Sequence, residues 1–157
     1  MKGIYLLIIS LPKEHDVRVG GLGKVHFPGG CYVYVGSALG GFKSRLNRHL
    51  RLDKTPKWHV DYLLQRGEVP KSQIGNELQK AHLESIIICE TSDRFECAIA
   101  RDLRRRFDSV PGFGSSDCGC PSHLFFDAEN MELKLTEILS ALGLKPRLLK
   151  DLSQINL

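Results

Sequence analysis

Hydrophobic and polar residues follow one another in short blocks that predict a mixture of strands and helices. Residues 2–10 are apolar at almost every position, which is typical of a strand that is buried on both faces of a sheet. Residues 31–35 place Tyr32 and Tyr34 on one face and valines on the other, and residues 83–89 are rich in β-branched side chains. These three segments are the expected strands of the sheet interior.

Helical periodicity and turn residues fill the rest of the pattern. The predicted helices cover residues 42–52, 58–65, 93–107 and 129–142. Residues 11–30 contain five glycines, and within them residues 16–19 and 24–27 are expected to pair as a hairpin. A last short strand is expected at residues 122–126.

The order of these elements predicts an α+β fold with a small, mainly antiparallel central sheet flanked by helices. The length of 157 residues suits one domain spanning residues 1–157, and no repeat or interdomain linker interrupts it. Within this domain, residues 11–30 are expected to form a hairpin or loop insertion, and residues 129–142 the C-terminal helix.

Composition narrows the class of protein. The chain is 42% hydrophobic and 25% charged, as in ordinary globular proteins, and it lacks an apolar run long enough to span a membrane. We interpret the apolar opening as a buried strand, not a signal peptide, and expect a cytoplasmic protein without a membrane partner. The odd count of five cysteines argues against a disulfide framework, and we interpret Cys31, Cys89 and Cys97 as core fillers.

The net charge of +4 is concentrated in two basic clusters. They consist of Lys43, Arg45, Arg48, Arg51, Lys54 and Lys57, and of Arg101, Arg104, Arg105 and Arg106. Such local excesses attract polyanions, although a solvated helix face has the same composition.

Two charged or polar residues interrupt the apolar stripe of the first predicted helix. Phe42, Leu46 and Leu50 follow the helical spacing, and Arg45 and His49 lie on the same stripe. An inward-facing arginine is costly unless an anion meets it, either a protein carboxylate or a ligand phosphate. The alternative is that the side chain of Arg45 extends over the core to reach water.

Glu96 similarly extends the apolar stripe of the helix predicted at residues 93–107. One interpretation is a capping box, with Asp93 as the N-cap and Glu96 reaching back to it. The other is a catalytic or metal-binding role, because Mg²⁺ accepts single carboxylates together with water and substrate oxygens.

Several short motifs resemble those of the GIY-YIG nuclease family. They are Gly3-Ile4-Tyr5, Tyr34-Val35-Gly36 with the following segment to His49, and Phe95-Glu96-Cys97. The chain is most similar to a mainly archaeal branch that is sometimes fused to endonuclease III, and the similarity runs from Gly3 to Phe126. The two tyrosine motifs are further apart than in most members, because residues 11–30 separate them.

The resemblance implies a metal-dependent endonuclease that hydrolyses nucleic-acid phosphodiester bonds. It implies catalytic roles for Tyr5, Tyr34, Arg45, His49 and Glu96, with Glu96 holding one Mg²⁺ or Mn²⁺ ion. The residues expected to bind substrate are Ser37, Lys43, Arg48, His59 and His123. The expected partner is nucleic acid, with DNA in a repair context favoured, and a functional link to base-excision repair enzymes.

The segment from Asp117 to His123 carries a second candidate chemistry. Cys118, Cys120 and His123 could bind Zn²⁺, with Asp117 or His82 as the fourth ligand, or they could belong to a plain loop. A zinc-organised module that binds nucleic acid without cutting it is therefore the alternative function. A thiol-based redox protein using Cys118 and Cys120 is a third.

Overall fold

A six-stranded antiparallel sheet forms the centre of the molecule, which confirms the expected α+β fold. The structure, a computed structural model, describes residues 2–50, 59–64, 81–114 and 119–150. The strands are arranged in the order β6-β7-β4-β1-β5-β8. They are β1 (Gly3–Leu11), β4 (Gly30–Ala38), β5 (His82–Glu90), β6 (Asp108–Ser109), β7 (Leu124–Asp127) and β8 (Arg147–Leu149).

β1 lies between β4 and β5, as its continuous apolar sequence predicts. Because side chains alternate along a strand, Tyr5 and Leu7 face one side of the sheet, and Ile4 and Leu6 face the other. All four side chains are buried. Each face of β1 therefore contributes to a separate hydrophobic layer.

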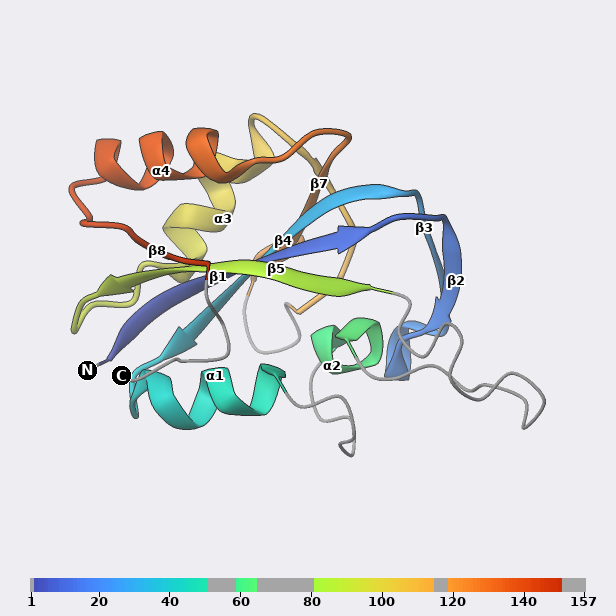
Figure 1. The fold of residues 1–157 in the computed structure, drawn as a ribbon, viewed down its shortest axis with the longest axis horizontal. Coiled ribbons are helices and arrows are strands. Elements are labelled where there is room, and N and C mark those ends of the chain that lie inside the picture. The colour runs from blue at the N-terminus through green and yellow to red at the C-terminus, as the bar shows by residue number, and fades with distance from the viewer. Residues whose placement is uncertain (1, 51–58, 65–80, 115–118, 151–157) are drawn as a thin grey trace.

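Two pairs of helices cover the two faces of the sheet (Figure 1). The helices are α1 (Phe42–Leu50), α2 (His59–Leu64), α3 (Glu96–Arg104) and α4 (Glu132–Ala141). α1 and α2 lie on the face that carries Tyr5, where Phe42 and Leu46 enter the core. α3 and α4 lie on the opposite face, where Ile99 and Leu135 are buried. None of the helices in the described ranges is long and apolar enough to cross a membrane.

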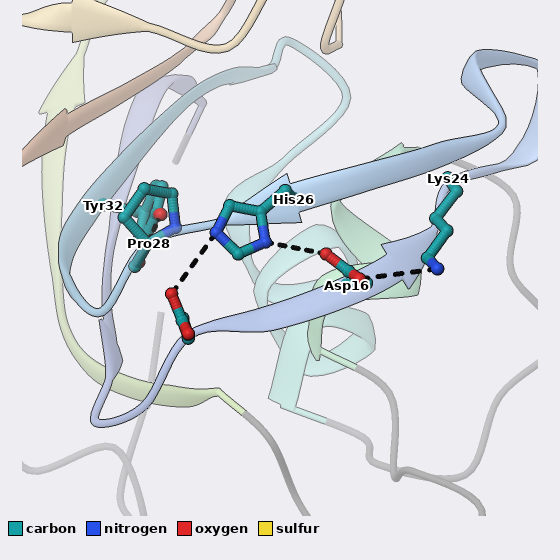
Figure 2. A network of polar contacts seen from close by, with 6 residues as sticks. Asp16, Lys24, His26, Pro28 and Tyr32 are labelled. Carbon is teal, nitrogen blue, oxygen red and sulfur yellow. Dashed lines mark hydrogen bonds and ion pairs between the residues drawn. The ribbon is translucent and has the colours of Figure 1, made fainter.

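The hairpin expected between the first two central strands is present as β2 (His15–Arg18) and β3 (Lys24–Phe27). Figure 2 shows Asp16 between two side chains of β3, with His26 Nδ1 at 2.7 Å and Lys24 Nζ at 3.4 Å. The hydrogen bond from His26 lowers the pKa of Asp16. Nearby, the Tyr32 hydroxyl donates a 2.6 Å hydrogen bond to the carbonyl oxygen of Pro28, which ties the end of the hairpin to β4.

The start of α3 differs from the capping-box interpretation. The helix begins at Glu96, and Phe95 occupies the N-cap position without a side-chain hydrogen bond. Asp93 lies outside the helix, where its backbone N–H donates to the Thr91 hydroxyl at 3.1 Å. The interpretation of Asp93 as the N-cap is therefore wrong, and Glu96 is available for another role.

Some element boundaries also differ from the periodicity. The final helix begins at Glu132, later than the expected residue 129. The backbone N–H of Glu132 donates a 2.8 Å hydrogen bond to the side-chain oxygen of Asn130. The strand expected at residues 122–126 is displaced to Leu124–Asp127. The short strands β6 and β8 were not expected, because two or three residues are too few to show a periodicity.

Candidate active site and adjoining cysteine–histidine cluster

Tyr5 and Tyr34 lie on adjacent strands and face the same side of the sheet. Tyr5 is paired with Gly36, and Tyr34 with Leu7, so the two tyrosines are diagonal neighbours. The Tyr5 ring lies directly against Gly36, where an added Cβ would lie 2.4 Å from Tyr5 Cζ and 2.5 Å from its hydroxyl oxygen. Gly36 therefore lets the Tyr5 hydroxyl cross β4 toward α1.

His49 on α1 meets the Tyr5 hydroxyl. Its Nε2 and the hydroxyl oxygen share a hydrogen bond of 2.8 Å, and the His49 side chain is only 2% exposed. The His49 ring centroid is 5.3 Å from that of Tyr5 and 6.3 Å from that of Tyr34. The histidine that interrupts the apolar stripe of α1 is thus a polar partner for the tyrosine pair.

Arg45 lies one helical turn before His49 and also points toward Tyr5. Its Nη1 donates a 3.0 Å hydrogen bond to the carbonyl oxygen of Ser37, and the residue is half-buried. Burial raises the pKa of Tyr5, and the charge and a hydrogen bond of the Arg45 guanidinium partly oppose this rise. Arg45 therefore directs its charge to the tyrosine hydroxyl.

Burial nevertheless raises the pKa of Tyr5 well above its ordinary value. Tyr34 and the negative charge of Glu96 raise it further, and Arg45 opposes them. Tyr5 is consequently a neutral phenol at physiological pH. The carboxylate of Glu96, half-buried in the first turn of α3, acts electrostatically on Tyr5 although α3 and α1 cover opposite faces of the sheet.

Phe113 and Gly114 complete the surroundings of Tyr34, and the sequence motifs predicted no role for either residue. Gly114 has a φ of +70°, and an added Cβ would lie 2.7 Å from Tyr34 Cε2. The Phe113 ring centroid lies 6.4 Å from that of Tyr34 and 5.6 Å from that of His59. The glycines of this loop are the sequence feature that could have indicated its role, since a positive φ and a close aromatic contact both favour glycine.

His59 on α2 fixes this loop. Its Nδ1 accepts a 2.8 Å hydrogen bond from the backbone N–H of Gly114, and burial lowers the pKa of the imidazole. The accepted hydrogen bond places the ring proton of neutral His59 on Nε2. His59 therefore supports the wall beside Tyr34.

The other residues expected to bind substrate have different surroundings. Lys43 is exposed on α1. Arg48 donates from Nη2 to Asp61 Oδ2 at 2.8 Å, where the Asp61 side chain is fully buried and that of Arg48 is 21% exposed. This ion pair joins α1 to α2, so Arg48 has a structural partner, whereas Lys43 extends toward solvent.

Cys97, Cys120 and His123 form a cluster that can hold a metal ion. Their ligand atoms, two Sγ atoms and one imidazole nitrogen, all lie within 4.8 Å of one another. Cys97 belongs to the first turn of α3 and is half-buried, so its interpretation as a core filler misses this cluster. Cys118 and Asp117, which the sequence also suggested, lie outside the described residues.

His123 connects the cluster to the sheet and to Glu96. Its backbone N–H donates to the Phe113 carbonyl at 2.8 Å, and its carbonyl accepts from the Val35 N–H at 3.0 Å. Burial lowers the pKa of its imidazole, and the Glu96 charge partly opposes this shift. His82, the other suggested ligand, is exposed at the start of β5. It pairs with Ser10, which lies at the opposite end of β1 from Tyr5.

These observations define an α+β domain with a tyrosine–histidine–arginine site on one face of its sheet and a Cys₂His cluster nearby. The chain belongs to the family described as Domain of unknown function DUF123, whose model matches residues 4–144. The matched range includes both tyrosines, α1, α3 and the cysteine–histidine cluster. Comparisons with curated proteins and with solved structures found no match.

Proposed function

We propose that this protein is a metal-dependent endonuclease of the GIY-YIG type that hydrolyses nucleic-acid phosphodiester bonds. The observation that carries the proposal is the convergence of His49 and Arg45 on the Tyr5 hydroxyl, beside Tyr34. A proton acceptor and a fixed cation at one phenol are the groups that water attack on a phosphodiester requires.

In the proposed reaction, the Arg45 guanidinium binds phosphate oxygens and neutralises charge that develops on them. The attacking water transfers its proton to the Tyr5 hydroxyl, whose own proton passes to His49 Nε2. This relay suits a phenol with a raised pKa, because Tyr5 remains neutral before and after the transfer. It requires a neutral His49 with its proton on Nδ1, and the leaving oxygen takes a proton from solvent water.

Glu96 is the proposed ligand of one Mg²⁺ or Mn²⁺ ion. It fits this role as a half-buried carboxylate whose charge reaches Tyr5, and the chemistry of Mg²⁺ accepts one carboxylate with several waters. When bound, the ion would neutralise charge on the scissile phosphate and on the leaving oxygen. Glu96 itself holds negative charge near the tyrosine site.

DNA in a repair context is the proposed substrate, with a functional link to base-excision repair enzymes. This choice follows the similarity of the motifs to a branch that is sometimes fused to endonuclease III. The exposed Lys43 on the Arg45 helix supports a polyanionic ligand. A cytoplasmic location is the matching proposal.

A nicking assay tests the proposal directly. The full chain is incubated with supercoiled plasmid and Mg²⁺ or Mn²⁺, beside Glu96→Gln and Arg45→Ala. We expect each variant to lose about a hundredfold or more of the nicking rate, as when one fixed transition-state donor is removed. Glu137→Gln makes the same chemical change on the exposed face of α4 and should leave the rate unchanged. Absence of metal-dependent nicking by the wild-type protein would refute the proposal.

The Cys97–Cys120–His123 cluster favours a second candidate, a metal-organised module that binds nucleic acid without cutting it. In this case, retarded migration of labelled DNA in a gel would accompany intact plasmid in every metal. Loss of DNA binding after removal of the cluster metal would then distinguish the module from an inactive nuclease.

A further inference from the structure

We propose that Cys97, Cys120 and His123 bind one Zn²⁺ ion, and that this ion holds the first turn of α3 against the loop that leads into β7. The zinc site goes beyond the proposed nuclease function. The consequence for Glu96 rests on that function, because Glu96 precedes Cys97 in the same helical turn.

The donor set matches the coordination chemistry of zinc. Zn²⁺ is a borderline-soft ion that accepts soft thiolates and imidazole in tetrahedral sites, with Zn–S of about 2.3 Å and Zn–N of about 2.0 Å. Such bond lengths separate neighbouring ligand atoms by roughly 3.5–3.8 Å. Since the three ligand atoms already lie within 4.8 Å of one another, closure around the ion needs a shift of about an ångström.

The loop that carries two of the ligands is fixed by its own hydrogen bonds. The buried Ser122 hydroxyl donates to the Leu124 carbonyl and accepts from the Leu124 N–H, both at 3.0 Å. His123 is bonded through its backbone to Phe113 and to Val35 on β4. The loop side of the site is therefore preorganised on the sheet, and Cys97 supplies the ligand from α3.

The two cluster thiols also differ from the other described cysteines in their access to solvent. Cys97 and Cys120 line a hollow of about 360 Å³ that runs along Arg101 and Arg104. The hollow has room for a water molecule to complete four-coordination. Cys31 and Cys89 are buried in the apolar layer below α3 and α4, where burial raises the pKa of each thiol. A metal ion can reach the first pair, whereas the second pair remains protonated.

Zinc at this position would join the Glu96 turn to the sheet. The Glu96 charge acts on both His123 and Tyr5, and Glu96 immediately precedes the ligand Cys97 in the first turn of α3. A cross-link at the next residue restricts the helical turn that presents this carboxylate. Glu96 would then meet its own Mg²⁺ ion with less loss of conformational freedom.

Metal analysis of the purified full chain tests the site. After growth with zinc and removal of loosely bound ions, we expect about one zinc per chain, as for a single tetrahedral site. Cys97→Ser and Cys120→Ser should each lose it, whereas Cys31→Ala, the matched control at a buried thiol, should retain it. Zinc-free wild-type protein that stays zinc-free when titrated with Zn²⁺ would overturn the proposal, as would full retention by Cys97→Ser.

Alkylation of the wild-type protein keeps the test independent of variant folding. With zinc bound, Cys97 and Cys120 should resist iodoacetamide, and a chelator should expose both to modification, as mapped by mass spectrometry. Equal modification with and without zinc contradicts the site.

The positioning role has a separate readout. Zinc removal should raise the Mg²⁺ concentration for half-maximal nicking, and an unchanged Mg²⁺ dependence would overturn this role. Zinc bound by a protein that never nicks DNA supports the site and refutes the nuclease.

Discussion

The hydroxyl of Tyr5 lies at the centre of the candidate site, and Gly36 determines the position of this hydroxyl. Tyr5 and Gly36 face each other across β1 and β4, and the absence of a side chain at Gly36 opens the path of the ring. Without that opening, the ring could not place its hydroxyl 2.8 Å from His49 Nε2. Gly36 is thus required by the packing of the side chain opposite it.

Gly36→Ala should therefore destabilise the protein. The new Cβ would lie 2.4 Å from Tyr5 Cζ, so either the ring or β4 must shift. We expect a loss of about 3 kcal/mol in the free energy of unfolding, the upper end for overpacking a core. Urea denaturation measures it, with Gly40→Ala as the control because an added Cβ there meets nothing within 4 Å. Equal unfolding midpoints for the two variants would contradict the packing argument.

His59 gives the protein a pH-dependent contact. Because burial lowers its pKa below the usual ~6.5, the unfolded chain binds more protons than the folded chain as the pH falls through that value. The contribution of His59 to stability is therefore complete above about pH 6.5 and is lost on acidification through its folded pKa.

His59→Asn tests this sign, because the amide oxygen can accept the Gly114 N–H and does not titrate. Its unfolding free energy should fall less between about pH 7.5 and pH 5 than that of the wild type. His59→Leu, which leaves the Gly114 N–H without its acceptor, should cost about 1–3 kcal/mol at neutral pH. Parallel pH profiles for the wild type and His59→Asn would show that His59 does not titrate as described.

For single residues, the sequence shows which polar side chains interrupt an apolar helix stripe. It does not show which residues they contact in the fold. Arg45 and His49 are visible as polar residues on an apolar stripe, and the structure places both at Tyr5. Cys97 has the apolar neighbours of a core filler, because its two fellow ligands are distant in sequence. The approach of Gly114 to Tyr34 also depends on a tertiary contact that no local pattern contains.

At the scale of elements, long apolar segments were the predictable part of the fold. β1, β4 and β5 were expected because each carries a continuous or alternating apolar run, and the hairpin was marked by its glycines. Their order in the sheet was not predictable, since either edge of β1 can pair with either neighbouring strand. The edge strands β6 and β8 are short and depend on pairing with β7 and β5 for their conformation.

A buried ion pair between two helices supports the face on which the candidate site lies. Asp61 of α2 is fully buried and accepts from Arg48 of α1 at 2.8 Å. This contact fixes α1, which presents Arg45 and His49, against α2, which presents His59. The pair therefore links the two sides of the tyrosine site.

Removing one partner of this ion pair should lower the free energy of unfolding, because the other charged group stays buried. Arg48→Met keeps most of the side-chain volume but leaves the Asp61 carboxylate buried without that guanidinium, and should cost about 3–5 kcal/mol. The double variant Arg48→Met with Asp61→Leu should recover part of the loss, because hydrophobic pairs often replace buried ions without penalty. Thermal denaturation of both variants measures this, and additive losses in the double variant would exclude the coupling.

At the scale of the whole molecule, the sheet separates two basic regions. α1 carries Lys43 on the side of the tyrosine site, whereas the arginine-rich α3 lies on the opposite face (Figure 1). A duplex that reaches Arg45 must approach from the α1 side, so the two regions cannot contribute equally to its binding. The net charge of +4 alone does not distinguish them.

The salt dependence of the proposed DNA binding tests which face of the sheet carries it. If the α1 face binds the backbone, Lys43→Gln removes one phosphate contact, and the slope of log affinity against log salt should decrease in magnitude by about 0.9. Lys134→Gln makes the same substitution on α4, where the lysine is paired with Asp127 at 3.3 Å, and should leave the slope unchanged. Fluorescence anisotropy of a labelled duplex across a salt series, with Ca²⁺ in place of Mg²⁺ to avoid cleavage, provides both slopes. A reduced slope in Lys134→Gln with an unchanged one in Lys43→Gln would move the interface to the opposite face and away from Tyr5.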